Sequence, residues 1–329
     1  MPETEAKKPV YLFYGEDTYS SNEKVKFWKD EFAKKYGSDS MEVIDGKNMD
    51  ISNFITNLEA VPFLSEKRLI VVKNFLAEAD KDNQKKIAQA LKNIPDFCIV
   101  VFHETQDPNK TTSLFKKIKQ IGTVTDFEHP SPGQLAKWIL EKAKGENIKI
   151  SPREAHVLST RCGLERWRVA NELDKLKLYA NGTEITEKMI DELVTPSLTE
   201  SIFKLTDAIA GKNPRESLKT LGILKDSGEE LTKIFFMIVR HFRILIQVHE
   251  MREKGASQPE ITQKLKAHPF VIQKTSAQSK NFTTEKLEKI YRKLLEIDRD
   301  FKTGIIKIYQ GDDSEYKLAI EKLIIDCCE

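Results

Sequence analysis

The sequence predicts an α/β domain with a parallel five-stranded sheet, followed by a small helical domain and a C-terminal all-helical domain. Three observations predict this order. Short β-branched runs alternate with helical patterns up to about residue 128, a cluster of prolines and glycine follows, and only helical patterns come after it. A chain of 329 residues is also too long for one compact core. We therefore expect domains at residues 1–130, 131–196 and 197–329.

The predicted sheet rests on five short apolar runs, four of which are each followed by a helical pattern. The expected strands are residues 10–14, 41–44, 69–72, 97–102 and 123–127. The expected helices are residues 20–36, 50–58, 80–92 and 111–121. Nearly continuous β-branched strands that alternate with helices are typical of a parallel sheet covered by helices on both faces.

Two boundary signals divide the remaining chain. Residues 129–133, with the sequence His-Pro-Ser-Pro-Gly, cannot continue a strand or a helix, so a new domain should begin there. From residue 134 to about residue 194 the pattern is purely helical and predicts four short helices. Thr195-Pro196-Ser197 marks the second boundary. Beyond it, residues 231–248 are apolar on more than one face, which predicts the central helix of a bundle.

Composition and charge exclude several classes of protein. The net charge of +2 is the balance of 53 basic and 51 acidic residues, which argues against a protein that coats nucleic acid with its whole surface but allows a local basic patch. No apolar run approaches the roughly 18 residues that a membrane span needs. The N-terminus is polar with no apolar signal core behind it, so we expect a cytoplasmic protein without membrane contact.

Metal and cofactor sites are not expected. The four cysteines, Cys98, Cys162, Cys327 and Cys328, form no C-x-x-C pair, and the six histidines show no metal-binding spacing. A parallel sheet usually binds its ligand at the carboxyl ends of its strands. The first strand continues as Gly15-Glu16-Asp17-Thr18, with one glycine, two carboxylates and no Gly-Lys-Ser/Thr. Glu16 and Asp17 are therefore interpreted as a turn and a helix cap, and no catalytic residue is assigned.

The stretch between the second helix and the third strand holds the candidate binding residues. Pro62 ends the helical pattern, and Phe63 and Leu64 follow it directly. Ser65-Glu66-Lys67-Arg68, which must lie near water, comes next. Two large apolar side chains at such a tip can fold back into the core or project toward a partner. The residues alone favour the core.

Four stretches of the chain, in the right order, carry a family resemblance. They run from Tyr11 to Tyr19, from Pro62 to Leu69, from Ser201 to Ala208, and from His268 to Val271 with residues 294–304 after it. Together with the order of domains, they make the chain similar to the delta subunit of the bacterial DNA polymerase III clamp loader, a relative of the AAA+ ATPases. The resemblance covers nearly the full length.

The resemblance implies a fold, a role and partners. It implies an AAA+-like first domain without ATPase activity, a helical lid, and a collar at residues 197–329. The role would be to bind and open the β sliding clamp, so that it can be loaded on primed DNA, as part of the DNA polymerase III holoenzyme, a DNA-directed DNA polymerase and nucleotidyltransferase. Its partners would be the clamp, the ATPase tau/gamma subunits and delta prime through the collar, and primed DNA through the complex. In this family an apolar pair after the second helix inserts into a clamp pocket, which favours clamp binding by Phe63 and Leu64 with Val61 and Pro62 beside them.

Two functions from other classes remain open at this point. One is a nucleotide-dependent enzyme with an atypical phosphate site, and measurable ATP binding by the chain alone would favour it. The other is a stand-alone nucleic-acid-binding protein, which strong and steeply salt-dependent duplex binding would support. The small net charge and the missing motifs weigh against both.

Overall fold

The computed structural model describes residues 9–62, 65–226, 228–309 and 312–328 of the chain. By the contacts among its residues, the chain divides into two compact units. One unit comprises Met1–Pro130 with Glu165–Trp167, and the other comprises Ser131–Leu164 with Arg168–Glu329. Each unit is described by itself.

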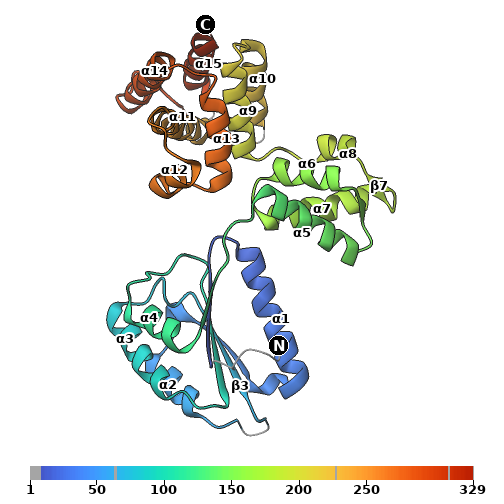
Figure 1. The fold of residues 1–329 in the computed structure, drawn as a ribbon, viewed down its shortest axis with the longest axis vertical. Helices are drawn as coiled ribbons and strands as arrows, with labels where there is room; N and C mark the ends of the chain where they lie inside the picture. The colour runs from blue at the N-terminus through green and yellow to red at the C-terminus, as the bar shows by residue number, and fades with distance from the viewer. Residues whose placement is uncertain (1–8, 63–64, 227, 310–311, 329) are drawn as a thin grey trace. The chain divides into compact units, whose positions relative to one another are not determined.

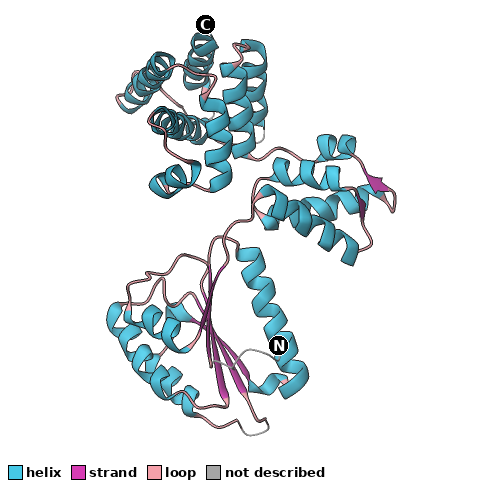
Figure 2. Cartoon of the chain, in the orientation of Figure 1, coloured by secondary structure: helices cyan, strands magenta, loops and turns pink. Residues whose placement is uncertain are grey.

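The first unit is built on a parallel sheet (Figure 2). Its strands are β1 (Val10–Tyr14), β2 (Met41–Asp45), β3 (Arg68–Lys73), β4 (Cys98–His103) and β5 (Thr123–Asp126). They pair in the order β2-β3-β4-β1-β5, and every pairing is parallel. The predicted five-stranded parallel sheet is confirmed within the described residues, with each strand within one residue of its expected bounds.

Helices cover both faces of this sheet, as Figure 1 shows. They are α1 (Thr18–Tyr36), α2 (Ile51–Glu59), α3 (Lys81–Ala90) and α4 (Ser113–Ile121), with short 3-10 turns at Ser38–Ser40, Gly46–Asn48 and Leu91–Asn93. Strand β3 contributes to the apolar core on each face of the sheet, because its successive side chains point to opposite faces. Leu69 and Val71 pack on the α1 side, whereas Ile70 and Val72 pack with α2, α3 and α4.

The second unit begins with helices that surround their own apolar core. In residues 131–196, all of them described, the helices are α5 (Pro132–Gly145), α6 (Pro152–Cys162), α7 (Arg166–Ala180, whose first two residues count with the first unit) and α8 (Glu187–Leu193). Ser131 caps α5 in a capping box, and Ser151 precedes α6 with a proline at its first position. The four predicted helices are therefore present.

The prediction that this stretch is purely helical is wrong at two points. β6 (Lys149–Ile150) and β7 (Glu184–Ile185) pair in parallel, each directly before the cap of the next helix. Lys149 lies opposite Glu184, and Ile150 lies opposite Ile185, which is buried. A strand of two residues is too short to show the alternation that identifies strands in a sequence, so no pattern could reveal this pair.

The rest of the second unit is a helical bundle (Figure 2). Its helices are α9 (Leu198–Ala210), α10 (Pro214–Asp226), α11 (Leu231–Glu253), α12 (Gln258–Leu265), α13 (Pro269–Ser279), α14 (Thr284–Lys302) and α15 (Ser314–Cys328). Helix α11 packs against α9, α13, α14 and α15, which confirms its predicted central place. Its buried side chains include Ile234, Phe235, Ile238, Phe242 and Leu245.

A buried polar network joins three helices of this bundle. The side-chain amide of Gln278 on α13 donates to the Phe203 carbonyl at 3.0 Å and to the Asp207 carboxylate at 2.6 Å, both on α9. Its oxygen lies 2.9 Å from Nε2 of His241 on α11. Because the amide oxygen can only accept, Nε2 of His241 carries the proton. Burial lowers the pKa of His241 to about 4, although the hydrogen bond with Gln278 opposes this shift.

The buried His241 makes the stability of the bundle depend on pH. Its pKa is about 4 in the folded chain against an ordinary 6.5, so the unfolded chain binds more protons between these values. The contribution of His241 to the free energy of unfolding is therefore fully present above pH 6.5. It decreases as the pH falls toward 4, by at most about 1.4 kcal/mol per pH unit. His241→Gln should flatten this dependence in hydrogen exchange of the α11 amides. His156→Gln, which changes an exposed histidine of α6, serves as the control; equal slopes for the two variants would contradict the prediction.

Candidate functional site

The connection between α2 and β3, residues 60–67, carries the candidate binding residues. Phe63 and Leu64 lie outside the described residues, whereas Val61 and Pro62 on their N-terminal side are described. The Val61 side chain is 76% exposed, and Pro62 is half-buried. The connection leads into the amino end of β3. In a parallel sheet the amino ends of all strands share one edge, so this connection lies at the edge opposite the loop after β1.

Helix α2 fixes the first end of the connection. The Asp50 carboxylate accepts from the Ser52 and Asn53 amides at 2.9 and 3.1 Å and so caps the helix. Phe54 and Leu58 are buried and hold the helix against the sheet. The helix ends at Glu59, as expected ahead of a proline, because the residue before proline disfavours helical backbone.

An ion pair joins both ends of the connection. Nη2 of Arg68, the first residue of β3, lies 2.9 Å from Oε2 of Glu42 on β2. Nη1 of Arg68 donates to the carbonyl of Ala60 at 3.5 Å, at the other end of the connection. The side-chain amide of Asn57 on α2 donates to the two Glu42 oxygens at 3.1 and 3.3 Å. Segments from β2, α2 and β3 therefore meet at one carboxylate.

The second end of the connection is tied to the turn before β4. The hydroxyl of Ser65 donates to the Lys67 carbonyl at 2.9 Å and accepts from the Lys67 amide at 3.3 Å. Nζ of Lys67 donates to the Asp96 carbonyl at 2.6 Å, and the Arg68 amide donates to the Phe97 carbonyl at 2.8 Å. The described residues on this side thus have defined partners, and the charged residues predicted to lie near water do so, with Glu66 exposed.

The opposite edge of the sheet holds the loop where a phosphate site was sought. Three residues, from Gly15 to Asp17, separate β1 from α1, whereas a P-loop motif is eight residues long. Gly15 has φ +129°, and a Cβ there would come within 2.4 Å of the Phe127 carbonyl oxygen. The Asp17 carboxylate accepts from the Ser20 amide, so a negative charge already occupies the helix N-terminus. This loop has the geometry of a capped turn rather than of a phosphate cradle.

A second carboxylate at this edge also binds the protein's own backbone. Glu104, directly after β4, is fully buried. It accepts from the Phe75 and Leu76 amides at 2.9 Å each and from the Ala77 amide at 3.1 Å. Burial raises the pKa of Glu104, and the three backbone donors oppose that shift. Sequence analysis missed Glu104; the available signal was a lone acidic residue at the end of a buried strand.

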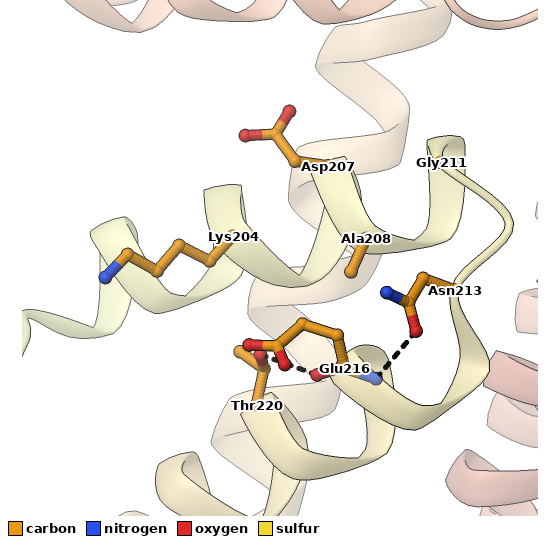
Figure 3. A pocket seen from close by; sticks show the side chains of 7 residues that line it. All are labelled: Lys204, Asp207, Ala208, Gly211, Asn213, Glu216 and Thr220. Atoms are coloured by element: carbon orange, nitrogen blue, oxygen red, sulfur yellow. Dashed lines mark hydrogen bonds between the residues drawn. The ribbon is translucent and has the colours of Figure 1, made fainter.

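A hollow of about 350 Å³ lies between α9 and α10 (Figure 3). Its lining residues are Lys204, Asp207, Ala208, Gly211, Asn213, Glu216 and Thr220. Asn213 accepts from the Glu216 amide at 3.1 Å, and the Thr220 hydroxyl donates to the Glu216 carbonyl at 2.8 Å. These contacts belong to the start of α10, so the hollow is part of a helix junction.

In the described ranges, no three or more histidine, cysteine, aspartate or glutamate side chains gather in a way that could hold a metal ion. None of the helices in the described part of the chain combines the length and apolarity that crossing a membrane requires.

Two sequence families match this chain. Residues 11–128 match the family described as DNA polymerase III, delta subunit, and residues 199–312 match its C-terminal domain. The DNA polymerase III subunit delta of Bacillus subtilis is 28% identical over 308 residues, which cover 90% of this chain and 88% of that protein. The chain belongs to the DNA polymerase III delta subunit family.

A solved structure agrees on the fold. The Bacillus subtilis DNA clamp loader delta protein matches with a TM-score of 0.66 and 24% identity, over 97% of this chain and 95% of that one. A RuvB Holliday junction branch migration motor from Thermotoga maritima matches with a TM-score of 0.43 and 8% identity, over 82% and 78% of the two chains. The delta subunit fold described here is an α/β domain with a parallel five-stranded sheet followed by a mainly helical region, as the sequence predicted.

The loop after β1 predicts that this delta subunit does not bind ATP by itself. Two carboxylates stand where phosphates would need positive charge, and no Lys follows a glycine there. Calorimetric titration of the chain with Mg²⁺ and ATP should show no binding in the micromolar range. A micromolar dissociation constant would contradict the prediction and would revive the hypothesis of a nucleotide-dependent enzyme.

Proposed function

We propose that this delta subunit binds the β sliding clamp through the α2–β3 connection and opens the ring, so that the clamp can be loaded on primed DNA. The observation that carries the proposal is a connection held at both ends by the Glu42–Arg68 pair, with the apolar sequence Val-Pro-Phe-Leu between them. Phe63 and Leu64 are the proposed anchors, with Val61 and Pro62 beside them.

The packing of α2 supports an outward role for this apolar stretch. Phe54 and Leu58 of α2 pack against the sheet, and both are nearly fully buried. Val61, the first apolar residue of the stretch, is instead mostly exposed. Ser65, Glu66, Lys67 and Arg68 follow on the other side. An apolar centre with a polar rim is the usual composition of a protein-binding hot spot.

The helical region supplies the proposed contacts with the other subunits. Residues 197–329 would form a collar that joins the ATPase tau/gamma subunits and delta prime, and residues 131–196 would form the lid. Several large apolar side chains of the bundle are at least half exposed, namely Phe236, Leu295, Ile305, Tyr309 and Leu318. Such exposed apolar groups favour a subunit interface.

The proposed division of labour follows from the missing phosphate site. ATP would be bound and hydrolysed by other subunits, and this chain would contribute clamp binding. Primed DNA would be reached through the assembled complex, in the cytoplasm. The chain would then act as part of the DNA polymerase III holoenzyme without catalysing a reaction of its own.

The double variant Phe63→Ala and Leu64→Ala tests the clamp contact. Truncating a well-buried anchor typically costs about 2 kcal/mol or more, and ~1.4 kcal/mol is tenfold in affinity, so clamp binding should weaken more than tenfold. The melting temperature should barely change. If both side chains belonged to the core, the loss of folding free energy would be roughly 4 kcal/mol or more. Unchanged clamp binding with a large loss of stability would reject the proposed site.

A truncated chain that ends at residue 196 tests the collar. It should keep clamp binding, because the α2–β3 connection is intact, and it should no longer assemble with the ATPase subunits in size-exclusion chromatography. The full-length Phe63→Ala, Leu64→Ala variant provides the reciprocal control, since it should assemble normally and fail to bind the clamp. Assembly of the truncated chain would show that residues 197–329 are not the collar.

A further inference from the structure

The ion pair between Glu42 and Arg68 joins segments that are far apart in the sequence, on strands β2 and β3. Glu42 lies on the edge strand β2, and Arg68 begins β3. Through Asn57 the same carboxylate reaches the last turn of α2, and through Arg68 it reaches the carbonyl of Ala60. The pair therefore spans the base of the α2–β3 connection from one end to the other.

We propose that Glu42 and Arg68, with Asn57, are positioning residues for clamp binding. They hold the two ends of the connection at a fixed separation and direction before the clamp arrives. This inference rests on the proposed function, because it concerns the same connection. On this inference, the affinity of Phe63 and Leu64 for the clamp depends on three polar residues that need not touch the clamp.

The physical reason is the entropy of the connection. An eight-residue connection with free ends samples many conformations, and binding must restrict them again. Preorganisation increases affinity by removing that cost before binding. Four described contacts restrict the ends here: Arg68 with Glu42, Arg68 with Ala60, Asn57 with Glu42, and the Arg68 amide with Phe97.

The contribution of the Glu42–Arg68 ion pair to folding stability is expected to be small, so stability alone does not explain it. Both side chains are partly exposed, with relative exposures of 21% for Arg68 and 33% for Glu42, and ion pairs at such sites usually stabilise a fold little. The guanidinium instead divides its donors between a carboxylate and a main-chain carbonyl, which orients the chain as well as pairing a charge. Lysine could not reproduce this planar fork.

The test compares Glu42→Gln, Arg68→Lys and the charge reversal Glu42→Arg with Arg68→Glu. Glu78→Gln is the matched control, because it breaks a similar surface pair, Lys47–Glu78 at 3.0 Å, in the same unit without touching the connection. For each variant we would measure clamp affinity by surface plasmon resonance, melting temperature, and hydrogen exchange of the amides at Val61, Ser65 and Lys67.

Glu42→Gln and Arg68→Lys should speed exchange at those amides and weaken clamp binding by roughly five- to thirtyfold, with little change in melting temperature. The charge reversal should restore part of the affinity, and Glu78→Gln should change neither quantity. In the Phe63→Ala, Leu64→Ala background, Glu42→Gln should add almost no further loss, because nothing remains to be positioned.

The outcomes separate this inference from the proposed function. If the anchor variant weakens clamp binding while Glu42→Gln and Arg68→Lys leave both affinity and exchange unchanged, the positioning role is wrong and the proposed site stands. If the anchor variant leaves clamp binding unchanged, the proposed site itself fails. A loss of affinity that matches an equal loss in melting temperature would show a structural role only and would also overturn the inference.

Discussion

The pairing of β3 between β2 and β4 is the constraint on which the rest of the first unit depends. β3 is buried on both faces, with Leu69 and Val71 in one core and Ile70 and Val72 in the other. A shift of its register by one residue would exchange the two sets and would place Arg68 or Lys73 inside. The register Arg68–Cys98 and Glu42–Ile70 therefore determines where the α2–β3 connection begins and which carboxylate its arginine meets.

The parallel sheet gives the unit two edges with different properties. At the carboxyl edge, Asp17 and Glu104 use their charges to satisfy the protein's own backbone amides. These carboxylates therefore occupy main-chain donors that could otherwise bind a phosphate at this edge. At the amino edge, Glu42, Asn57 and Arg68 hold the ends of the α2–β3 connection.

Most of the fold could be predicted from the sequence because its signals are strong and local. The β-branched strands of the sheet and the apolar pattern of residues 231–248 each have a direct physical cause. The β6–β7 pair could not be predicted, since two residues show no periodicity. The site was only partly predictable. The candidate apolar stretch stands out after Pro62, but the partners Glu42 and Arg68 are 26 residues apart and meet only through strand pairing. Neither carries a local motif.

On the proposed function, a subunit that does not hydrolyse ATP can open a ring only through differences in binding energy. A ligand shifts an equilibrium between two states by the ratio of its affinities for them, and equal affinity for both states shifts nothing. On the proposed function, the connection must therefore bind the open clamp more tightly than the closed one. A connection with loose ends could adapt to both states and would lose this discrimination. Rigid ends, held by Arg68 and Glu42, would make the connection bind one geometry of the clamp more tightly than the other. On the proposed function, a surface ion pair would thus contribute to the free energy that opens the ring.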